Sequence, residues 1–464
     1  MKLTFQEYYN SLPSNIIEEG GAYGHMANIH EKWTLAFWDL KQLIRMGLSG
    51  GVSKEVKEKT DGQALAFSYT FKNADKLQGG KIVFARNAGH YRKFGKGAMR
   101  GAKGVADQFL EHPVQGVKDA FTFAAKDLEA AFAKLSPETL YELFHNGARW
   151  VNIEIIWPEN ENVIPYGDHN LLVLHNYREY DEDGNTLSGD FNYYGEYIAK
   201  ILRKVNLDVQ EKFKITSMPI LKIPEVADYD NHIDRLTKPI DDIQREYNIT
   251  DDDLVGEYWI KYMTNYIRTN ANNMGYNLDS RLDVIDKLAY RWAYGKTNPK
   301  PSDYKQRTYR TITQLKKDLP VDMNQPELAR NFGQWISEQD KNIANIHAGM
   351  LDPIRMTFAE VGMFVIQNIS SLLTLNPSKA AAKIRTRLED AIKQAKSSQD
   401  PKTIETIDRH LKTIQSLGGL EAIVPTEGVT FTYTPRGSDE QIIFKYTGNF
   451  GAINQSLGIA TYGR

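Results

Sequence analysis

The chain has 464 residues, of which 41% are hydrophobic and 25% are charged, and its formal net charge is -2. This length predicts about two or three packed units, and the near-neutral charge means that any nucleic-acid surface must be a local patch. The sequence contains no cysteine, which excludes disulfides, thiol nucleophiles and zinc sites that need sulfur.

The N-terminal stretch MKLTFQEYYNSLPSNIIEE lacks the basic segment and the continuous apolar run of a signal peptide. The most apolar helical stretch, residues 358–375, contains Glu360, Gln367 and Asn368, which is typical of a buried core helix rather than a membrane span. We therefore expect a cytoplasmic protein that has no membrane partner, and we expect it to be a monomer.

Short segments rich in β-branched and aromatic residues occur toward both ends of the chain, each bounded by Gly, Asn, Asp or Pro. They predict strands at 63–71, 81–86, 149–156, 170–177, 213–223, 428–434 and 441–446. Helical patterns at 107–135 and 190–205 lie among the first five strands.

From about residue 225 to 418 the pattern is helix after helix, with Pro, Asn and Asp at the breaks. The clearest helix starts at Asp400-Pro401 and ends at Gly418-Gly419. We predict an α+β fold in which a core made of residues 1–224 and 419–464 is interrupted by an all-helical insertion at 225–418.

A lysine, Lys59, stands one residue before an Asp-Gly pair in the hexapeptide EKTDGQ, just before the first predicted strand. Such a Lys-x-Asp-Gly match arises by chance in roughly one chain in ten of this length. Further charged residues stand at or within later predicted strands: Arg86, Glu154, Glu427 and Lys445. Lys-x-Asp-Gly followed by Glu-Gly-Val, each abutting a strand, is expected by chance in roughly one chain in a hundred.

The ordered series EKTDGQ, FARN, NIEII, TEGVTF and IFKY resembles the motifs of the covalent nucleotidyltransferase superfamily. That superfamily contains ATP-dependent DNA ligases, RNA ligases and mRNA-capping guanylyltransferases. The phrases GHMANIHEKWTLAFWDLKQLI and NVIPYGDHNLLVLHNY further resemble ligase-like proteins encoded by large bacteriophages. The resemblance covers residues 20–180 and 420–455 and implies an antiparallel-sheet nucleotidyltransferase core of the ATP-grasp-like ligase type, in a phage-infected host cell.

The resemblance implies that Lys59 attacks the α-phosphorus of ATP and carries AMP on its amine, with Asp61 and Lys445 as the other catalytic residues. Lys445 would contact the α-phosphate, and Glu427, together with Glu154, would hold Mg²⁺ or Mn²⁺. These roles are chemically coherent, because a lysine is a nucleophile only after it loses its proton, and a nearby cation favours that loss. Magnesium commonly binds through one or two carboxylates and the phosphates themselves.

The same resemblance assigns the nucleotide contacts. Glu58 would meet the adenine edge through its backbone, and Glu154 would accept a hydrogen bond from the ribose. Arg86 would hold the ribose or the incoming 5′-phosphate. Either His175 or Tyr177 would stack on adenine. Taken singly, Glu154 could instead be a rim carboxylate paired with Arg149, and Lys445 a solubilising residue of an edge strand.

Three features depart from the family pattern. The last motif reads Lys445-Tyr446-Thr447 where the family commonly has Lys-x-Lys, and Ala64 stands where DNA ligases usually have arginine. Only 19 residues follow Lys445, which predicts that there is no C-terminal OB barrel. We therefore expect the helical insertion to clamp the substrate.

A basic segment includes the second predicted strand and extends beyond it. Residues 76–105 contain eight Lys or Arg and no Asp or Glu, with several glycines and aromatic residues interleaved. This composition is typical of phosphate contacts with little sequence readout, although a solvated basic loop is the alternative. The predicted nucleic-acid contacts are Arg92, Lys93, Lys96, Arg100 and Lys103.

Together these features predict an ATP-dependent polynucleotide ligase that joins 5′-phosphate and 3′-hydroxyl ends of RNA or DNA, with RNA slightly favoured. One alternative is a GTP-using capping-type nucleotidyltransferase. The other is a non-catalytic protein that binds nucleic-acid ends.

Overall fold

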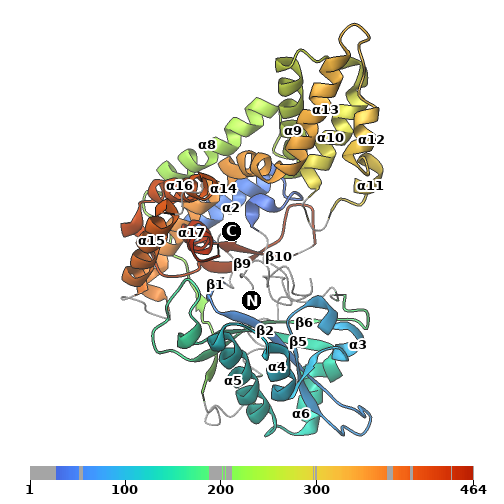
Figure 1. Cartoon of the computed structure of the whole chain (residues 1–464). Coiled ribbons are helices and arrows are strands. Elements are labelled where there is room, and N and C mark those ends of the chain that lie inside the picture. Colours follow the sequence, from blue (N-terminus) through green and yellow to red (C-terminus); the bar gives the residue numbers. More distant parts are fainter. Residues whose placement is uncertain are drawn as a thin grey trace.

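The structure, a computed structural model, describes residues 28–51, 56–185, 212–295, 300–373, 380–397, 401–439 and 441–462, and the single positions 187, 201, 204 and 297. Most of the helix predicted at 190–205 lies outside the described residues. Figure 1 shows the helices and strands.

Two sheets form the β-structure of the described residues, and neither closes into a barrel. The four-stranded sheet has the order β10 (Ile442–Tyr446), β9 (Val429–Tyr433), β1 (Val56–Glu58) and β8 (Ile220–Leu221). The six-stranded sheet has the order β4 (Met99–Arg100), β3 (Lys81–Ala85), β2 (Gln63–Thr70), β5 (Arg149–Ile156), β6 (Leu171–Glu179) and β7 (Lys214–Ser217). All pairs are antiparallel except β6 with β7. The predicted α+β class is thus confirmed, whereas an antiparallel arrangement is wrong for that one pair.

The predicted strands are present, with one difference in the segment 213–223. This segment divides into β7, which belongs to the six-stranded sheet, and β8, which belongs to the four-stranded sheet. Strands β1 and β4 were not predicted, because three and two residues are too few to show a period of two.

Helices cover one face of the six-stranded sheet (Figure 1). They are α4 (Gly101–Phe109), α5 (Gln115–Phe132) and α6 (Pro137–Phe144). The predicted helix at 107–135 is therefore two helices, interrupted between Phe109 and Gln115. Side chains such as Phe67 from β2, Phe132 from α5 and Ile153 from β5 form the core between sheet and helices.

Between residues 229 and 416, the described residues form helices and no strand. The helices are α8 (Tyr229–Tyr247), α9 (Val255–Asn273), α10 (Leu282–Tyr294), α11 (Tyr304–Arg307), α12 (Ile312–Lys317), α13 (Pro326–Lys341), α14 (Ile343–Ile369), α15 (Ala380–Ser397) and α16 (Pro401–Ser416). Helix α16 confirms the prediction at 401–416. The division of the chain into a core and an insertion stays a prediction.

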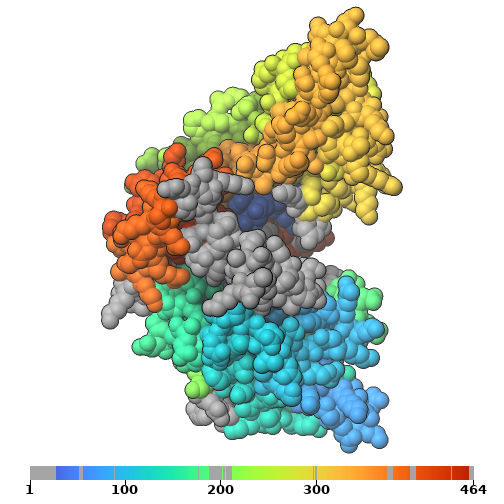
Figure 2. All heavy atoms as spheres, viewed as in Figure 1, coloured from blue at the N-terminus to red at the C-terminus, as the bar shows by residue number. Residues whose placement is uncertain are grey.

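The helical region and the four-stranded sheet share one hydrophobic core. Leu43 of α2 (Phe37–Ser49), Val361 of α14 and Phe444 of β10 all belong to it. The C-terminal helix α17 (Phe450–Tyr462) packs with α15 and α16. In Figure 2, helices α9–α13 form one end of the elongated molecule, and the six-stranded sheet with its helices forms the other.

The apolar stretch predicted as a core helix forms the second half of α14, with Phe358, Val361, Val365 and Ile369 buried. Among the described residues, no helix combines the length and the apolar character that a membrane span requires.

Candidate active site

The segment Lys59–Gly62 connects the two sheets. Glu58 is the last residue of β1 in the four-stranded sheet, and Gln63 is the first residue of β2 in the six-stranded sheet. The N–H of Lys59 donates a hydrogen bond to the carbonyl oxygen of Gly428, 2.8 Å away. Lys59 is therefore held where the two sheets meet. We call this junction, formed by residues Lys59–Gly62, the seam.

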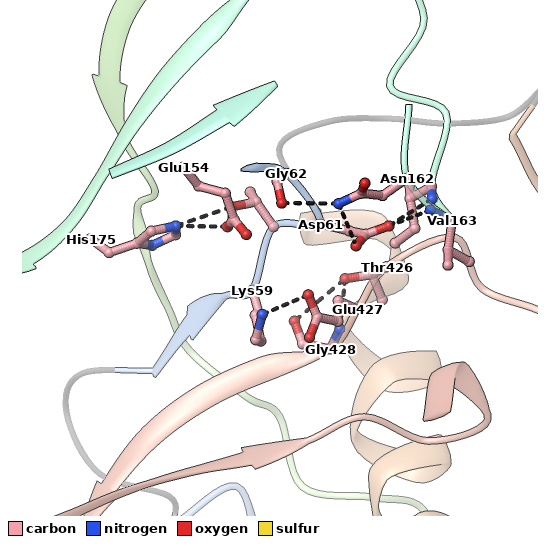
Figure 3. Close-up of polar contacts among 12 residues, drawn as sticks. Lys59, Asp61, Gly62, Glu154, Asn162, Val163, His175, Thr426, Glu427 and Gly428 are labelled. Carbon is pink, nitrogen blue, oxygen red and sulfur yellow. Dashed lines mark hydrogen bonds and ion pairs between the residues drawn. The ribbon is translucent and has the colours of Figure 1, made fainter. Parts of the chain in front are cut away.

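The side chain of Lys59 forms an ion pair with Glu427, which precedes β9 (Figure 3). Lys59 Nζ lies 2.6 Å from Glu427 Oε2, and the two side chains are only 15% and 12% exposed. Burial by itself would lower the pKa of Lys59, but the carboxylates of Glu427, Glu154 and Asp61 outweigh it and raise that pKa well above its usual value. Lys59 is thus protonated at neutral pH in this structure.

A second polar group lies across the seam, on the six-stranded sheet. The Thr60 hydroxyl donates to Glu154 of β5. His175 Nε2 of β6 lies 2.9 Å from Glu154 Oε2 and 3.1 Å from Thr60 Oγ1. Burial would raise the pKa of Glu154, but Lys59 and the hydrogen bond with His175 lower it to about 2. Glu154 is therefore an anion that faces the lysine side of the seam.

An irregularity in β6 decides which aromatic candidate joins this group. The β5–β6 register shifts between Asn152 and Ile153, so that His175 is an extra residue opposite β5. His175 consequently lies on the face of Glu154, whereas Tyr177 packs on the opposite, helix-covered face. The ring of Tyr177 also lies 5.3 Å from the guanidinium carbon of Arg149. Of the two proposed adenine-stacking residues, only His175 lies on the same face of the sheet as Glu154.

Asp61 faces away from the Lys59 amine and binds a loop (Figure 3). Its Oδ2 accepts hydrogen bonds from the N–H groups of Val163 and Ile164, at 2.8 and 2.9 Å, and its own N–H donates to the Tyr166 hydroxyl at 2.7 Å. Burial, reinforced by Glu427, raises the pKa of Asp61 to about 7. The geometry gives Asp61 a role in holding the turn, and the catalytic role assigned to it stays a prediction.

Two glycines allow the close backbone approaches at the seam. A Cβ on Gly62 would lie 2.6 Å from the carbonyl oxygen of Ile155, and one on Gly428 would lie 1.9 Å from that of Tyr446. Gly428 also has a φ of +119°, which residues with a Cβ rarely adopt. Neither position can accept a larger residue without moving a strand.

Lys445 lies on β10, opposite Thr430 of β9. Burial lowers its pKa, the nearby Glu427 opposes this effect, and the positive charge of Lys59 adds to it. Lys59 and Glu427 therefore both lie near enough to Lys445 to affect its ionisation. β10 is an edge strand, but Lys445 is only partly exposed on it.

The Arg86 side chain lies on the helix-covered face of the six-stranded sheet, opposite to the face that carries Glu154. Its Nη1 donates to the carbonyl oxygen of Ala64 at 2.9 Å, and its guanidinium carbon lies 4.7 Å from the ring centre of Phe121 on the helix-covered face. Burial lowers its pKa to about 10. Glu58 is buried at the end of β1, with its backbone next to Lys59. The nucleotide contacts assigned to Arg86 and Glu58 stay predictions.

The structure leaves the predicted metal site open. Among the described residues, no group of three or more His, Cys, Asp or Glu side chains is arranged to hold a metal ion. A magnesium ion bound partly by phosphate oxygens needs only one or two carboxylates, and the metal role assigned to Glu427 and Glu154 stays a prediction. The alternative in which Glu154 pairs with Arg149 is wrong, because Arg149 Nε donates to Glu179 at 2.6 Å.

The predicted nucleic-acid residues lie apart from this group but on one continuous stretch. Arg92 and Lys93 belong to α3 (Arg92–Gly95), Arg100 to β4 and Lys103 to α4, and these four residues and Lys96 are exposed. Lys103 forms an ion pair with Asp107, at 2.8 Å.

Sequence reasoning missed several residues that hold the site. Thr60 is the variable position of Lys-x-Asp-Gly, so the motif gives no signal for it. Arg387 of α15 donates through Nη1 to the carbonyl oxygens of Asn162 and Val163, at 2.8 and 3.2 Å. It thereby ties the helical region to the loop that holds Asp61, a contact between residues more than two hundred positions apart that no local pattern encodes.

Comparisons of the chain with protein-family models, with curated proteins and with solved structures find no match. The fold and the site define the chain as a mixed α+β protein with a buried lysine–carboxylate cluster where two sheets meet.

Proposed function

We propose that the protein is an ATP-dependent polynucleotide ligase that works through a lysyl-AMP intermediate on Lys59. The observation that supports this proposal best is the convergence on Lys59 of Glu427 from one sheet and Glu154 from the other, with Lys445 nearby. Phosphoryl transfer depends mainly on positioning and charge neutralisation, and this set of groups supplies both. The RNA-joining form is slightly favoured, because Ala64 replaces the arginine that DNA ligases usually have.

The chemistry proceeds in three displacements. The Lys59 amine attacks the α-phosphorus of ATP, a nitrogen–phosphorus bond forms, and pyrophosphate leaves. An oxygen of a 5′-phosphate end then displaces the lysine and takes the AMP. Finally a 3′-hydroxyl attacks that 5′-phosphorus, the phosphodiester forms, and AMP leaves.

Lys59 must lose its proton before the first displacement. In the structure Glu427 stabilises the ammonium form, so the nucleophile is generated only when the ion pair opens. Lys445 opposes the ammonium charge of Lys59 and favours the neutral amine once Glu427 turns away. A divalent cation held by Glu427 would neutralise phosphate charge. Glu154, held by Thr60 and His175, would orient a hydroxyl group.

An adduct assay tests the proposal. The protein is incubated with Mg²⁺ and either ATP or GTP, quenched in acid and analysed by intact-mass spectrometry. We expect an AMP adduct that Lys59→Ala abolishes and that added pyrophosphate removes. A GMP adduct instead would move the assignment to a capping-type transferase.

The matched control is Lys57→Ala, which changes the neighbouring buried lysine of β1 and should leave the adduct if the variant stays folded. Sealing assays on nicked duplexes and on single strands, with DNA and RNA ends in each combination, then identify the substrate.

One observation favours a second candidate function, a non-catalytic protein that binds nucleic-acid ends. The short ion pair with Glu427 stabilises the ammonium form of Lys59. An ammonium group can bind a phosphate but cannot attack it as a nucleophile. No adduct with either nucleotide, combined with retained binding of 5′-phosphorylated ends, would favour this candidate.

A further inference from the structure

A buried aromatic group fixes the segment Tyr91–Lys96 to the six-stranded sheet. Tyr91 is 1% exposed, and its ring stacks on Tyr180 with centroids 4.1 Å apart. It also meets Trp150 of β5 edge-on, at 5.0 Å. Trp150 is in turn held by a hydrogen bond from Nε1 to the carbonyl oxygen of Gly147, at 2.8 Å. The segment therefore has a rigid base.

This base lies on the same sheet face as the lysine cluster. Trp150 and Glu154 are four residues apart on β5, and side chains at even separations on a strand share a face. Their separation along the strand is about 13 Å, at about 3.3 Å per residue. A polymer that reaches Lys59 across this face would meet the segment.

Two residues of the segment, Lys93 and Phe94, have a strained backbone. Lys93 and Phe94 both have left-handed backbone angles, with φ of 51° and 50°, which are costly for residues that carry a Cβ. The N–H of Lys93 donates to the carbonyl oxygen of Glu182, and the backbone of Phe94 packs so closely that a Cβ on Gly147 would lie 2.4 Å from its carbonyl oxygen. The surrounding structure thus enforces the strain. Strain of this kind is concentrated at functional sites.

The ring of Phe94 is exposed, and three exposed cationic residues lie within two positions of it in the sequence. Phe94 is 38% exposed, and Arg92, Lys93 and Lys96 beside it are exposed as well. None of these three cations forms an ion pair with another residue that the structure describes. The acidic residue Glu182 contacts the segment through its backbone, where its carbonyl oxygen accepts the hydrogen bond from Lys93. An aromatic face among cations is the combination that binds single strands, since the ring stacks on a base and the cations meet phosphates.

We propose that Phe94 is a base-stacking residue that binds one unpaired base of a single-stranded polynucleotide, while Arg92, Lys93 and Lys96 bind the adjacent phosphates. A base inside a duplex has both faces covered and must be unstacked before it can meet the ring, so the site selects single strands over intact duplex. The inference rests on the proposed function, which identifies the partner as a polynucleotide. It narrows that partner to a polynucleotide with an unpaired end.

Fluorescence anisotropy with a labelled single-stranded oligonucleotide, and with the same sequence in a blunt duplex, tests the proposal on the full chain. We expect Phe94→Leu to weaken single-strand binding by about 5- to 150-fold and to leave duplex binding unchanged. Phe94→Trp should retain the affinity. The matched control is Tyr141→Leu, which removes an aromatic ring that is 43% exposed on α6, outside the basic segment, and it should change neither affinity.

Salt dependence separates stacking from charge. Phe94→Leu should leave the slope of log affinity against log salt unchanged, whereas Arg92→Gln should reduce that slope by about 1. The fluorescence of an adenine analogue in the strand should be quenched by the wild-type protein and not by Phe94→Leu. A quenching signal in the wild type stays informative even if the variant unfolds.

The proposal is overturned if Phe94→Leu, with an unchanged melting temperature, binds single strands as the wild type does or loses single strand and duplex equally. The adduct assay separates this outcome from the ligase proposal. An AMP adduct without a Phe94 effect refutes the stacking site alone. A Phe94-dependent preference for single strands without any adduct refutes the ligase and leaves the stacking site standing.

Discussion

The ion pair between Lys59, where the two sheets meet, and Glu427, which precedes β9 of the four-stranded sheet, should couple these two residues energetically. At 2.6 Å between Nζ and Oε2, the attraction is about 6 kcal/mol at an effective dielectric constant of about 20, before desolvation is subtracted. Removing one partner of a nearly buried pair typically costs about 3 to 5 kcal/mol, because the other charge stays buried without it. We expect about 3 kcal/mol for Glu427→Gln, because Lys59 keeps the attraction of Glu154 and Asp61. Lys59→Met should cost more, because it removes the cation from all three carboxylates.

A double-mutant cycle measures this coupling. Urea unfolding of the wild type, Glu427→Gln, Lys59→Met and the double variant at pH 7 should give a coupling energy of about 2 to 3 kcal/mol. The double variant should be more stable than the sum of the single effects predicts. Additivity within about 0.5 kcal/mol would refute the reasoning, because residues that do not interact add to that degree.

The pH dependence of the same pair has a defined sign. The folded state raises the pKa of Lys59 above its unfolded value of about 10.4, so the stabilisation is fully present below that value and is lost as the pH rises through the folded pKa. The part of the difference between wild type and Lys59→Met that comes from the ionisation of Lys59 itself should therefore be constant near neutral pH. It should shrink only in strongly alkaline solution.

Three further predictions concern neighbouring residues. Burial raises the pKa of Asp61 to about 7, so the folded state binds a proton more tightly than the unfolded state. The free energy of unfolding should therefore fall as the pH rises from about 4 to 7. Asp61→Asn should remove that slope in urea unfolding, and an unchanged slope would contradict this assignment. Thr60→Val removes one of the two side-chain partners of Glu154, leaving His175, and should cost about 1 to 3 kcal/mol, whereas Thr60→Ser should restore most of the stability, and equal losses would show that the hydroxyl is not the cause. Lys93→Gly relieves a left-handed backbone and should stabilise the protein by about 1 kcal/mol, seen as a higher melting temperature, and a lower one would argue against the strain.

Much of the local structure was predictable from the sequence. Alternating apolar residues marked strands such as β2 and β9, and the apolar period with its Asp-Pro start marked α16. The same patterns put Lys59 just before a strand and Glu427 just before another. These predictions succeeded because side-chain periodicity is set by backbone geometry within a few residues.

The pairing of those elements was decided by the tertiary structure. Nothing local shows that Lys59 to Gly62 pass from one sheet to the other, because β1 has three residues and is defined by its pairing with β8 and β9. Periodicity also does not show that residues 213–223 contribute a strand to each of the two sheets. Strand partners depend on contacts between residues far apart in the chain, which a local pattern does not contain.

The residue types available around Lys59 follow from the sequence, but which of them face it depends on strand register and on buried hydrogen bonds. A strict period of two puts His175 and Tyr177 on one face, but the extra residue in β6 sends them to opposite faces. Arg86 points to the helix-covered side, and Asp61 turns toward the amides of Val163 and Ile164. Side-chain direction depends on register, and one bulge or one buried hydrogen bond reverses what the spacing of residues suggests.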